Sequence, residues 1–83
     1  MMKTEMNLTP LLPMDRMNAA LLAQTASHFE SCLTLEKGGI VLNLKSMLGL
    51  LSRPSFGDGR VILVADGQDE EEAIKAILAI TQN

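Results

Sequence analysis

The sequence predicts an α+β domain in which a four-stranded antiparallel sheet carries its helices on one face. The spacing of apolar residues switches repeatedly between the period of a strand and the period of a helix, in the order β-α-β-β-α-β-α. The chain has 83 residues, of which 47% are apolar. That length favours a single domain, residues 1–83, and that apolar fraction suffices for its core.

The first strand is predicted over residues 2–9, where apolar and polar side chains alternate. Met6 and Leu8 fall on the side expected to be buried. Pro10 and Pro13 end the strand, because proline donates no hydrogen bond to a neighbouring strand.

A helix is predicted from Asp15 onward, where apolar residues recur at the spacing of one helix face. That face is expected to be buried and consists of Ala19, Leu22, Ala23 and Ala26. Phe29 closes its apolar end, and His28, the only histidine, lies near the helix C-terminus.

A hairpin is predicted next. Residues 31–36 alternate in polarity with Leu33 and Leu35 inward, and residues 40–44 form the return strand. The Lys-Gly-Gly sequence between them suits a tight turn, because glycine tolerates positive φ.

A second, short helix is predicted at residues 47–51, with Ser46 as its N-cap. Five residues do not hold a helix alone, so this one needs packing. Residues 53–59 are expected to form a loop, and the apolar run 61–65 predicts a central strand.

The last helix is expected to follow a turn at Gly67, with Asp69 and Glu72 at the spacing of a capping box. Its buried face is predicted to contain four apolar residues: Ala73, Ile74, Ile77 and Ile80.

The composition argues against several classes of function. A net charge of −3, no Trp, no Tyr and two Phe argue against nucleic-acid binding. The single cysteine, Cys32, forms neither an intrachain disulfide nor a cysteine-based metal site and is read as a filler in a strand. No apolar run approaches a membrane span, and no apolar signal core is present near the start. We therefore expect a cytoplasmic protein without a metal or other cofactor.

Residues 43–52 (NLKSMLGLLS) resemble the regulatory-serine motif of HPr, the small phosphocarrier of the bacterial phosphoenolpyruvate-dependent sugar phosphotransferase system. Residues 22–27 (LAQTAS) resemble the end of the first HPr helix. Four further residues resemble the start of the last helix: Gly67, Asp69, Glu70 and Ala73. The resemblance covers nearly the whole chain and implies the HPr fold, an open-faced β-sandwich of four antiparallel strands and three helices.

The resemblance breaks at residues 13–19 (PMDRMNA), where the first HPr helix begins Gly-Leu/Ile-His-Ala-Arg-Pro-Ala. Asp15 stands at the position of the histidine that carries phosphate from enzyme I to the IIA proteins. Met17 replaces the arginine and Asn18 the proline. The likeness thus implies a member without the phosphoacceptor histidine, and HPr-like regulatory paralogues of this kind are known in Bacillus-type bacteria.

Three interpretations of Asp15 are open. It is an N-cap or plain surface carboxylate, a charge that imitates phosphohistidine for a partner, or a phosphoacceptor that forms an acyl phosphate. The last usually requires Mg²⁺ held by several acidic ligands, and the sequence shows no acidic cluster near Asp15.

Ser46 is the predicted regulatory phosphorylation site. In HPr proteins of Gram-positive type, the matching serine is phosphorylated by a bifunctional HPr kinase/phosphorylase. Phosphate on an N-cap adds negative charge beside the positive end of the helix dipole, and Lys45 adds positive charge nearby. The alternative is a capping serine with no regulatory role.

A partner-binding surface is predicted at four residues that match the docking surface of HPr: Ala20, Met47, Leu48 and Leu51. At least two of the three residues on the short helix are expected to be exposed, while Leu50 points inward. The alternative is that they pack on the core.

These features favour a regulatory HPr-like binding module without a catalytic site of its own. Its expected partners are an HPr kinase/phosphorylase-like enzyme and either a catabolite-control-type regulator or a metabolic enzyme, and neither nucleic acid nor a membrane. A diverged phosphocarrier that uses Asp15 and a degenerate domain with an unrelated binding role are the alternatives.

Overall fold

The computed structural model describes residues 1–52 and 57–81. Of the loop expected over residues 53–59, only 57–59 lie within the described part, and they form a turn. The elements follow the predicted order, with one added 3-10 turn, η1: β1 (Met2–Asn7), η1 (Thr9–Leu11), α1 (Arg16–Ala26), β2 (Cys32–Lys37), β3 (Ile40–Asn43), α2 (Met47–Leu51), β4 (Arg60–Asp66) and α3 (Glu70–Thr81).

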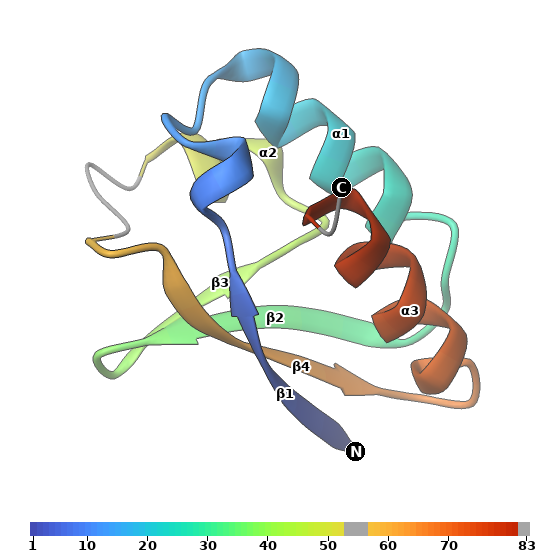
Figure 1. Ribbon diagram of the computed structural model, residues 1–83. Helices are drawn as coiled ribbons and strands as arrows, with labels where there is room; N and C mark the ends of the chain where they lie inside the picture. Colours follow the sequence, from blue (N-terminus) through green and yellow to red (C-terminus); the bar gives the residue numbers. More distant parts are fainter. Residues whose placement is uncertain (53–56, 82–83) are drawn as a thin grey trace.

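The four strands form one antiparallel sheet in the order β1-β4-β2-β3, so β4 is a central strand as its apolar run predicts. Figure 1 shows α1, α2 and α3 together on one side of this sheet. The predicted α+β class, an open-faced sandwich with its helices on one face, is confirmed.

The core lies between the sheet and the helices. Across β1, β4 and β2 the inward side chains are in register, with Met6 opposite Val61 and Leu35 opposite Leu63. The predicted faces of α1 and α3 supply seven of the buried residues: Ala19, Leu22, Ala23, Ala26, Ala73, Ile74 and Ile77. Ile80 is half-buried at the end of α3, and Phe29 packs partly buried against the core.

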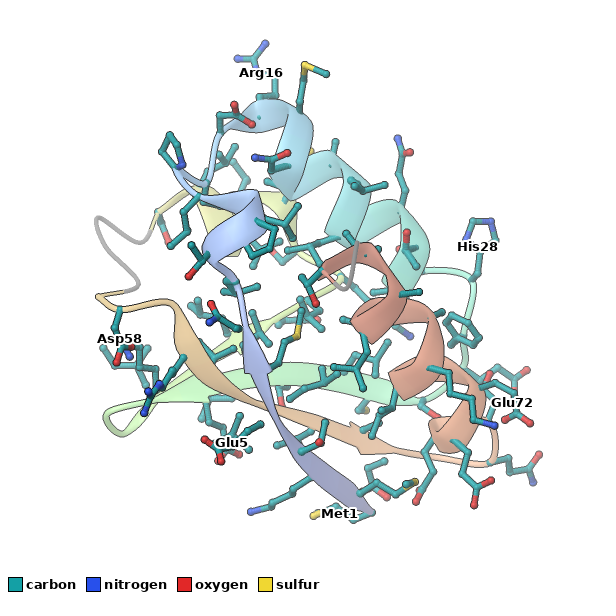
Figure 2. All side chains as sticks on the ribbon, viewed as in Figure 1. Met1, Glu5, Arg16, His28, Asp58 and Glu72 are labelled. Carbon is teal, nitrogen blue, oxygen red and sulfur yellow. The ribbon has the colours of Figure 1, made fainter. Side chains whose placement is uncertain are left out.

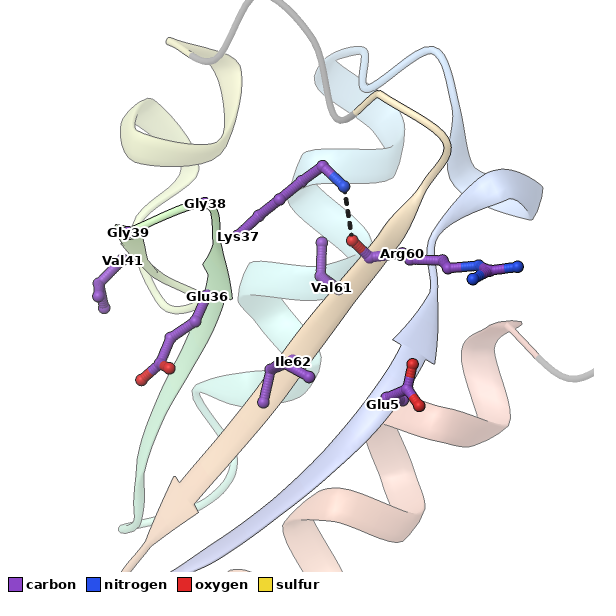
Figure 3. Close-up of a pocket in the computed structure, with 9 residues that line it drawn as sticks. All are labelled: Glu5, Glu36, Lys37, Gly38, Gly39, Val41, Arg60, Val61 and Ile62. Carbon is purple, nitrogen blue, oxygen red and sulfur yellow. Dashed lines mark hydrogen bonds between the residues drawn. The ribbon is translucent and has the colours of Figure 1, made fainter.

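The β2–β3 hairpin is anchored to the start of β4 by one lysine. Its turn contains Gly38 and Gly39, both at positive φ. The Lys37 ammonium donates to the backbone carbonyl of Arg60 at 2.9 Å, as Figure 3 shows, and to the carboxylate of Asp58 at 3.2 Å. The hairpin and the turn before β4 are therefore held together at one end of the sheet.

The open face of the sheet carries polar and apolar side chains in one row. Glu5, Ile62 and Glu36 are in register on three adjacent strands and line a hollow on this face (Figure 3). Figure 2 shows Glu5 on the side of the sheet away from the helices. This hollow is therefore on the face opposite the helices.

The predicted capping box of Asp69 and Glu72 is wrong. The Asp69 carboxylate instead accepts from the backbone N–H groups of Glu30 at 2.9 Å and Ser31 at 3.0 Å, and from the Ser31 hydroxyl. The Glu70 carboxylate accepts from the Gly67 N–H at 3.2 Å. The backbone N–H groups before β2 thus donate to the Asp69 carboxylate. This side chain therefore joins the start of α3 to the segment before β2.

Gly67 and Ser31 approach closely where these two segments meet. A Cβ atom added to Gly67 would lie 2.7 Å from the Cα of Ser31, a distance that backbone atoms do not tolerate. Ser31 itself is buried, with 1% of its surface exposed. Glycine at position 67 is therefore required by packing.

The Asp69 contacts predict a specific pH dependence of stability. The hydroxyl of Ser31, followed by the N–H of Glu30, holds the pKa of Asp69 below its usual value of 3.8. The ionised carboxylate therefore stabilises the fold above that usual value, and this contribution is lost as the pH falls through the lowered pKa. We expect Asp69→Asn to be less stable than the unaltered chain near neutral pH, with the difference shrinking in strong acid.

Urea denaturation midpoints measured from neutral pH down to acid check this expectation. The control is Glu71→Gln, which removes one carboxylate from an exposed position on the same helix. A stability difference between Asp69→Asn and the unaltered chain that does not change with pH would contradict the assignment.

Candidate functional site

The two helix starts singled out by the sequence lie on neighbouring elements. Asp15 precedes α1, Ser46 precedes α2, and the two helices contact each other. Figure 1 shows α2 beside α1 on the helical side of the molecule. The structure thus brings the candidate phosphoacceptor position and the candidate regulatory serine to one side of the protein.

Asp15 is the N-cap of α1, as predicted. Its backbone is extended, and its Oδ1 accepts from the backbone N–H of Asn18 at 2.9 Å. Its own carbonyl accepts from the N–H of Ala19 at 2.9 Å, which is the first bond of the helix. The carboxylate is exposed and satisfies one of the N–H groups that a helix start leaves without a partner.

Asn18 fixes the segment that approaches α1, a role that the sequence did not indicate. Its side-chain amide donates to the carbonyl of Leu11 at 2.8 Å and to that of Pro13 at 3.4 Å. The backbone N–H of Asn18 is the group that Asp15 caps. One residue thus connects the helix start to η1 and to the segment after it.

Arg16 and Met17 are the first two residues of α1, and both are exposed. Figure 2 shows the Arg16 guanidinium pointing away from the protein at the start of α1. Within residues 1–52 and 57–81, Arg16 forms no ion pair. Met17 exposes 81% of its surface and carries no hydrogen-bond donor for an anion.

Ser46 is the N-cap of α2, also as predicted. Its Oγ accepts from the backbone N–H of Gly49 at 3.1 Å, and its carbonyl accepts from the N–H of Leu50 at 3.1 Å. A Cβ atom on Gly49 would lie 3.3 Å from this Oγ, so glycine leaves room for the capping hydroxyl. Ser46 is half-buried, between the core and the surface.

Lys45, next to Ser46, is bonded to a distant segment of the chain. Its ammonium donates to the backbone carbonyl of Phe29 at 2.7 Å, in the segment that follows α1. The side chain is half-buried. A new partner at Ser46 would therefore have to compete with this bond for the Lys45 ammonium.

The predicted docking residues differ in exposure. Leu48 exposes 82% of its surface, while Ala20, Met47 and Leu51 are half-buried. The expectation that at least two of the three short-helix residues are exposed is therefore wrong, because Met47 and Leu51 pack against the core. Leu50 is buried at 0%, as expected. Two further apolar residues, Met17 and Leu21, are exposed on α1, and the sequence did not indicate either as a docking residue. We use the name α1–α2 apolar surface for the whole set: Met17, Ala20, Leu21, Met47, Leu48 and Leu51.

Two side chains with reactive groups, His28 and Cys32, are not part of the α1–α2 apolar surface or of the two helix caps. His28 is exposed just after α1, and Figure 2 shows it pointing outward beyond the helix. Cys32 is exposed at the start of β2. Among the described residues, no three His, Cys, Asp or Glu side chains form a group that could hold a metal ion. None of the helices described is long and apolar enough to cross a membrane.

The cap at α1 predicts the effect of two substitutions on stability. Asp15→Ala removes the acceptor for the Asn18 N–H and is expected to lower the free energy of unfolding by about 1 kcal/mol. Asp15→Asn keeps an oxygen at the cap and is expected to lose only a fraction of that. Urea denaturation of the two variants and the unaltered chain measures both effects. Equal losses for the two variants would contradict a capping role for this side chain.

Comparison with known proteins connects this geometry to a family. The family model described as "PTS HPr component phosphorylation site" matches residues 14–83. The HPr-like protein Crh of Bacillus subtilis strain 168 is 42% identical over 64 residues, which are 77% of this chain and 75% of Crh.

Solved structures agree with the sequence matches. The crystal structure of HPr-C-His from Thermoanaerobacter tengcongensis superposes with a TM-score of 0.86 at 36% identity, covering 96% of this chain and 90% of that one. The crystal structure of B. subtilis Crh superposes with a TM-score of 0.74 at 40% identity, covering 82% of this chain and 78% of that one.

Proposed function

Because the chain belongs to the HPr family, we propose that it is a regulatory binding module switched by phosphorylation of Ser46 and unable to transfer phosphate through a histidine. The observation that supports the proposal is that Asp15, the residue that the resemblance aligns with the family's phosphoacceptor, is the N-cap of α1. An HPr-like protein, Crh, is among the relatives that the chain resembles over most of its length.

The side chains at the start of α1 do not suit histidine-type phosphoryl transfer. Asp15 offers a carboxylate oxygen in place of an imidazole nitrogen, and that carboxylate is engaged as a cap at 2.9 Å. Met17 offers a thioether, which neither donates a hydrogen bond nor carries a charge to hold a phosphoryl group. The cap alone accounts for Asp15 without any role in phosphoryl transfer.

The environment of Ser46 supports the regulatory role. Its oxygen lies at the N-terminus of α2, where the positive end of the peptide dipoles favours an anion. A phosphate there adds about −1.5 to −2 charges and keeps oxygen atoms able to accept from the Gly49 N–H. Phosphorylation at this position is expected to change the surface charge without unfolding α2.

The proposed partners follow from the surface around Ser46. The residue is phosphorylated by an HPr kinase/phosphorylase-like enzyme, and the modified protein binds a catabolite-control-type regulator or a metabolic enzyme in the cytoplasm. The α1–α2 apolar surface is the proposed docking site, because exposed Met and Leu side chains are costly in water and typical of contact surfaces. The protein acts by binding and has no catalytic site of its own.

Phosphorylation with two variants tests the proposal. Incubation with an HPr kinase/phosphorylase and ATP is expected to add one phosphate to the unaltered chain and to Asp15→Ala, but none to Ser46→Ala. Intact-protein mass spectrometry counts the phosphate, and fragmentation places it. Ser52→Ala is the matched control, because Ser52 is the C-cap of the same helix.

Two results would count against the regulatory role. Labelling that survives Ser46→Ala would place the modification elsewhere. Absence of any phosphate on the unaltered chain would favour a degenerate HPr-fold domain with another binding role.

A further inference from the structure

Met17 is the most exposed of the six methionines, ahead of Met1 at 71%. It exposes 81% of its surface, whereas Met6 exposes 4%, and Met2, Met14 and Met47 are half-buried and pack against the core. We propose that Met17 is a peroxide-sensitive modification site whose sulfoxide weakens docking of an HPr kinase/phosphorylase-like enzyme at the α1–α2 apolar surface. The consequence for docking rests on the proposed function, and the site of oxidation does not.

The oxidation step needs only a peroxide and an accessible thioether. The sulfur of Met17 attacks one peroxide oxygen, a sulfur–oxygen bond forms, and the oxygen–oxygen bond breaks. With hydrogen peroxide, water is the leaving product, so sulfur is oxidised as the peroxide is reduced. A residue that is 81% exposed meets the oxidant directly, whereas the half-buried methionines pack against the core.

Met17 belongs to the α1–α2 apolar surface, so its oxidation would change the polarity of that surface. It lies in the first turn of α1, with Leu21 one turn further along the same helix and 44% exposed. Leu48 on neighbouring α2 is 82% exposed. A sulfoxide converts the apolar thioether into a polar group, so it removes an apolar contact from a surface suited to an apolar partner.

Oxidation of Met17 is not expected to destabilise the fold. Met17 is neither in the buried core nor among the partly buried residues packed against it. Its sulfoxide is therefore expected to alter the surface while leaving the unfolding free energy nearly unchanged. Oxidation of Met6, by contrast, would place a polar group in the core.

Met1 provides an internal control. It exposes 71% of its surface and is also expected to oxidise readily. Figure 2 shows Met1 and Arg16, the neighbour of Met17, at opposite ends of the molecule. Oxidation of Met1 therefore lies far from the α1–α2 apolar surface.

Peptide mapping after brief treatment with hydrogen peroxide tests the site. Met17 and Met1 are expected to form sulfoxide several-fold faster than Met14 and Met47. Met17 reacting no faster than Met14 and Met47 would overturn the proposal.

The functional consequence is tested with Ser46 phosphorylation by an HPr kinase/phosphorylase, after the peroxide has been removed with catalase. The rate for the oxidised protein is expected to fall several-fold and to recover after treatment with methionine sulfoxide reductase. Each variant is compared with its own rate before oxidation. Met17→Leu is expected to lose this sensitivity, and Met14→Leu, the matched control, is expected to keep it.

The outcomes separate the two proposals. A chain that is phosphorylated equally well before and after oxidation of Met17 would overturn only the proposed effect of oxidation on docking. Met17→Gln adds a second check, because a polar side chain of similar length should lower the rate without oxidant. A reduced chain that accepts no phosphate at Ser46 would overturn the proposed function, and with it the proposed effect of Met17 oxidation on docking.

Discussion

The first turn of a helix leaves backbone N–H groups without partners, and in α1 the side chain of Asp15 supplies one acceptor. The capped residue, Asn18, sends its own side chain back to the carbonyls of Leu11 and Pro13. These bonds fix the start of α1 relative to η1. The proposed function depends on this arrangement, because a carboxylate engaged as a helix cap has a structural role without any phosphoryl transfer.

The exposure of the docking residues follows from how α2 is held. A helix of five residues is not stable alone, so Leu50 must be buried against the core, where it is 0% exposed. Leu48 precedes it by two positions and therefore points to the opposite side of the helix. The packing that stabilises α2 thus also presents an apolar side chain to solvent, on the helix that Ser46 caps and that contacts α1.

Local patterns predicted most of the fold and both helix caps. The period of the apolar residues located the strands, the helices and the buried faces, and the capping residues Asp15 and Ser46 are recognisable from their place before helical segments. Bonds between distant parts of the chain left no such pattern. Asp69 binds a segment 38 residues away, so the sequence misassigned its side chain, and nothing in the sequence indicated that the Lys45 ammonium binds the carbonyl of Phe29. The exposure of Met17 likewise depends on how the helices pack.

The most direct test of the central claim is incubation of the unaltered chain with phosphoenolpyruvate and enzyme I, beside an HPr that carries the histidine. We expect the histidine-containing HPr to acquire phosphate and this chain to acquire none at Asp15, as followed by intact-mass measurement and hydroxylamine sensitivity. A phosphate on Asp15 that hydroxylamine removes would contradict this expectation and would identify a phosphocarrier that works through a carboxylate.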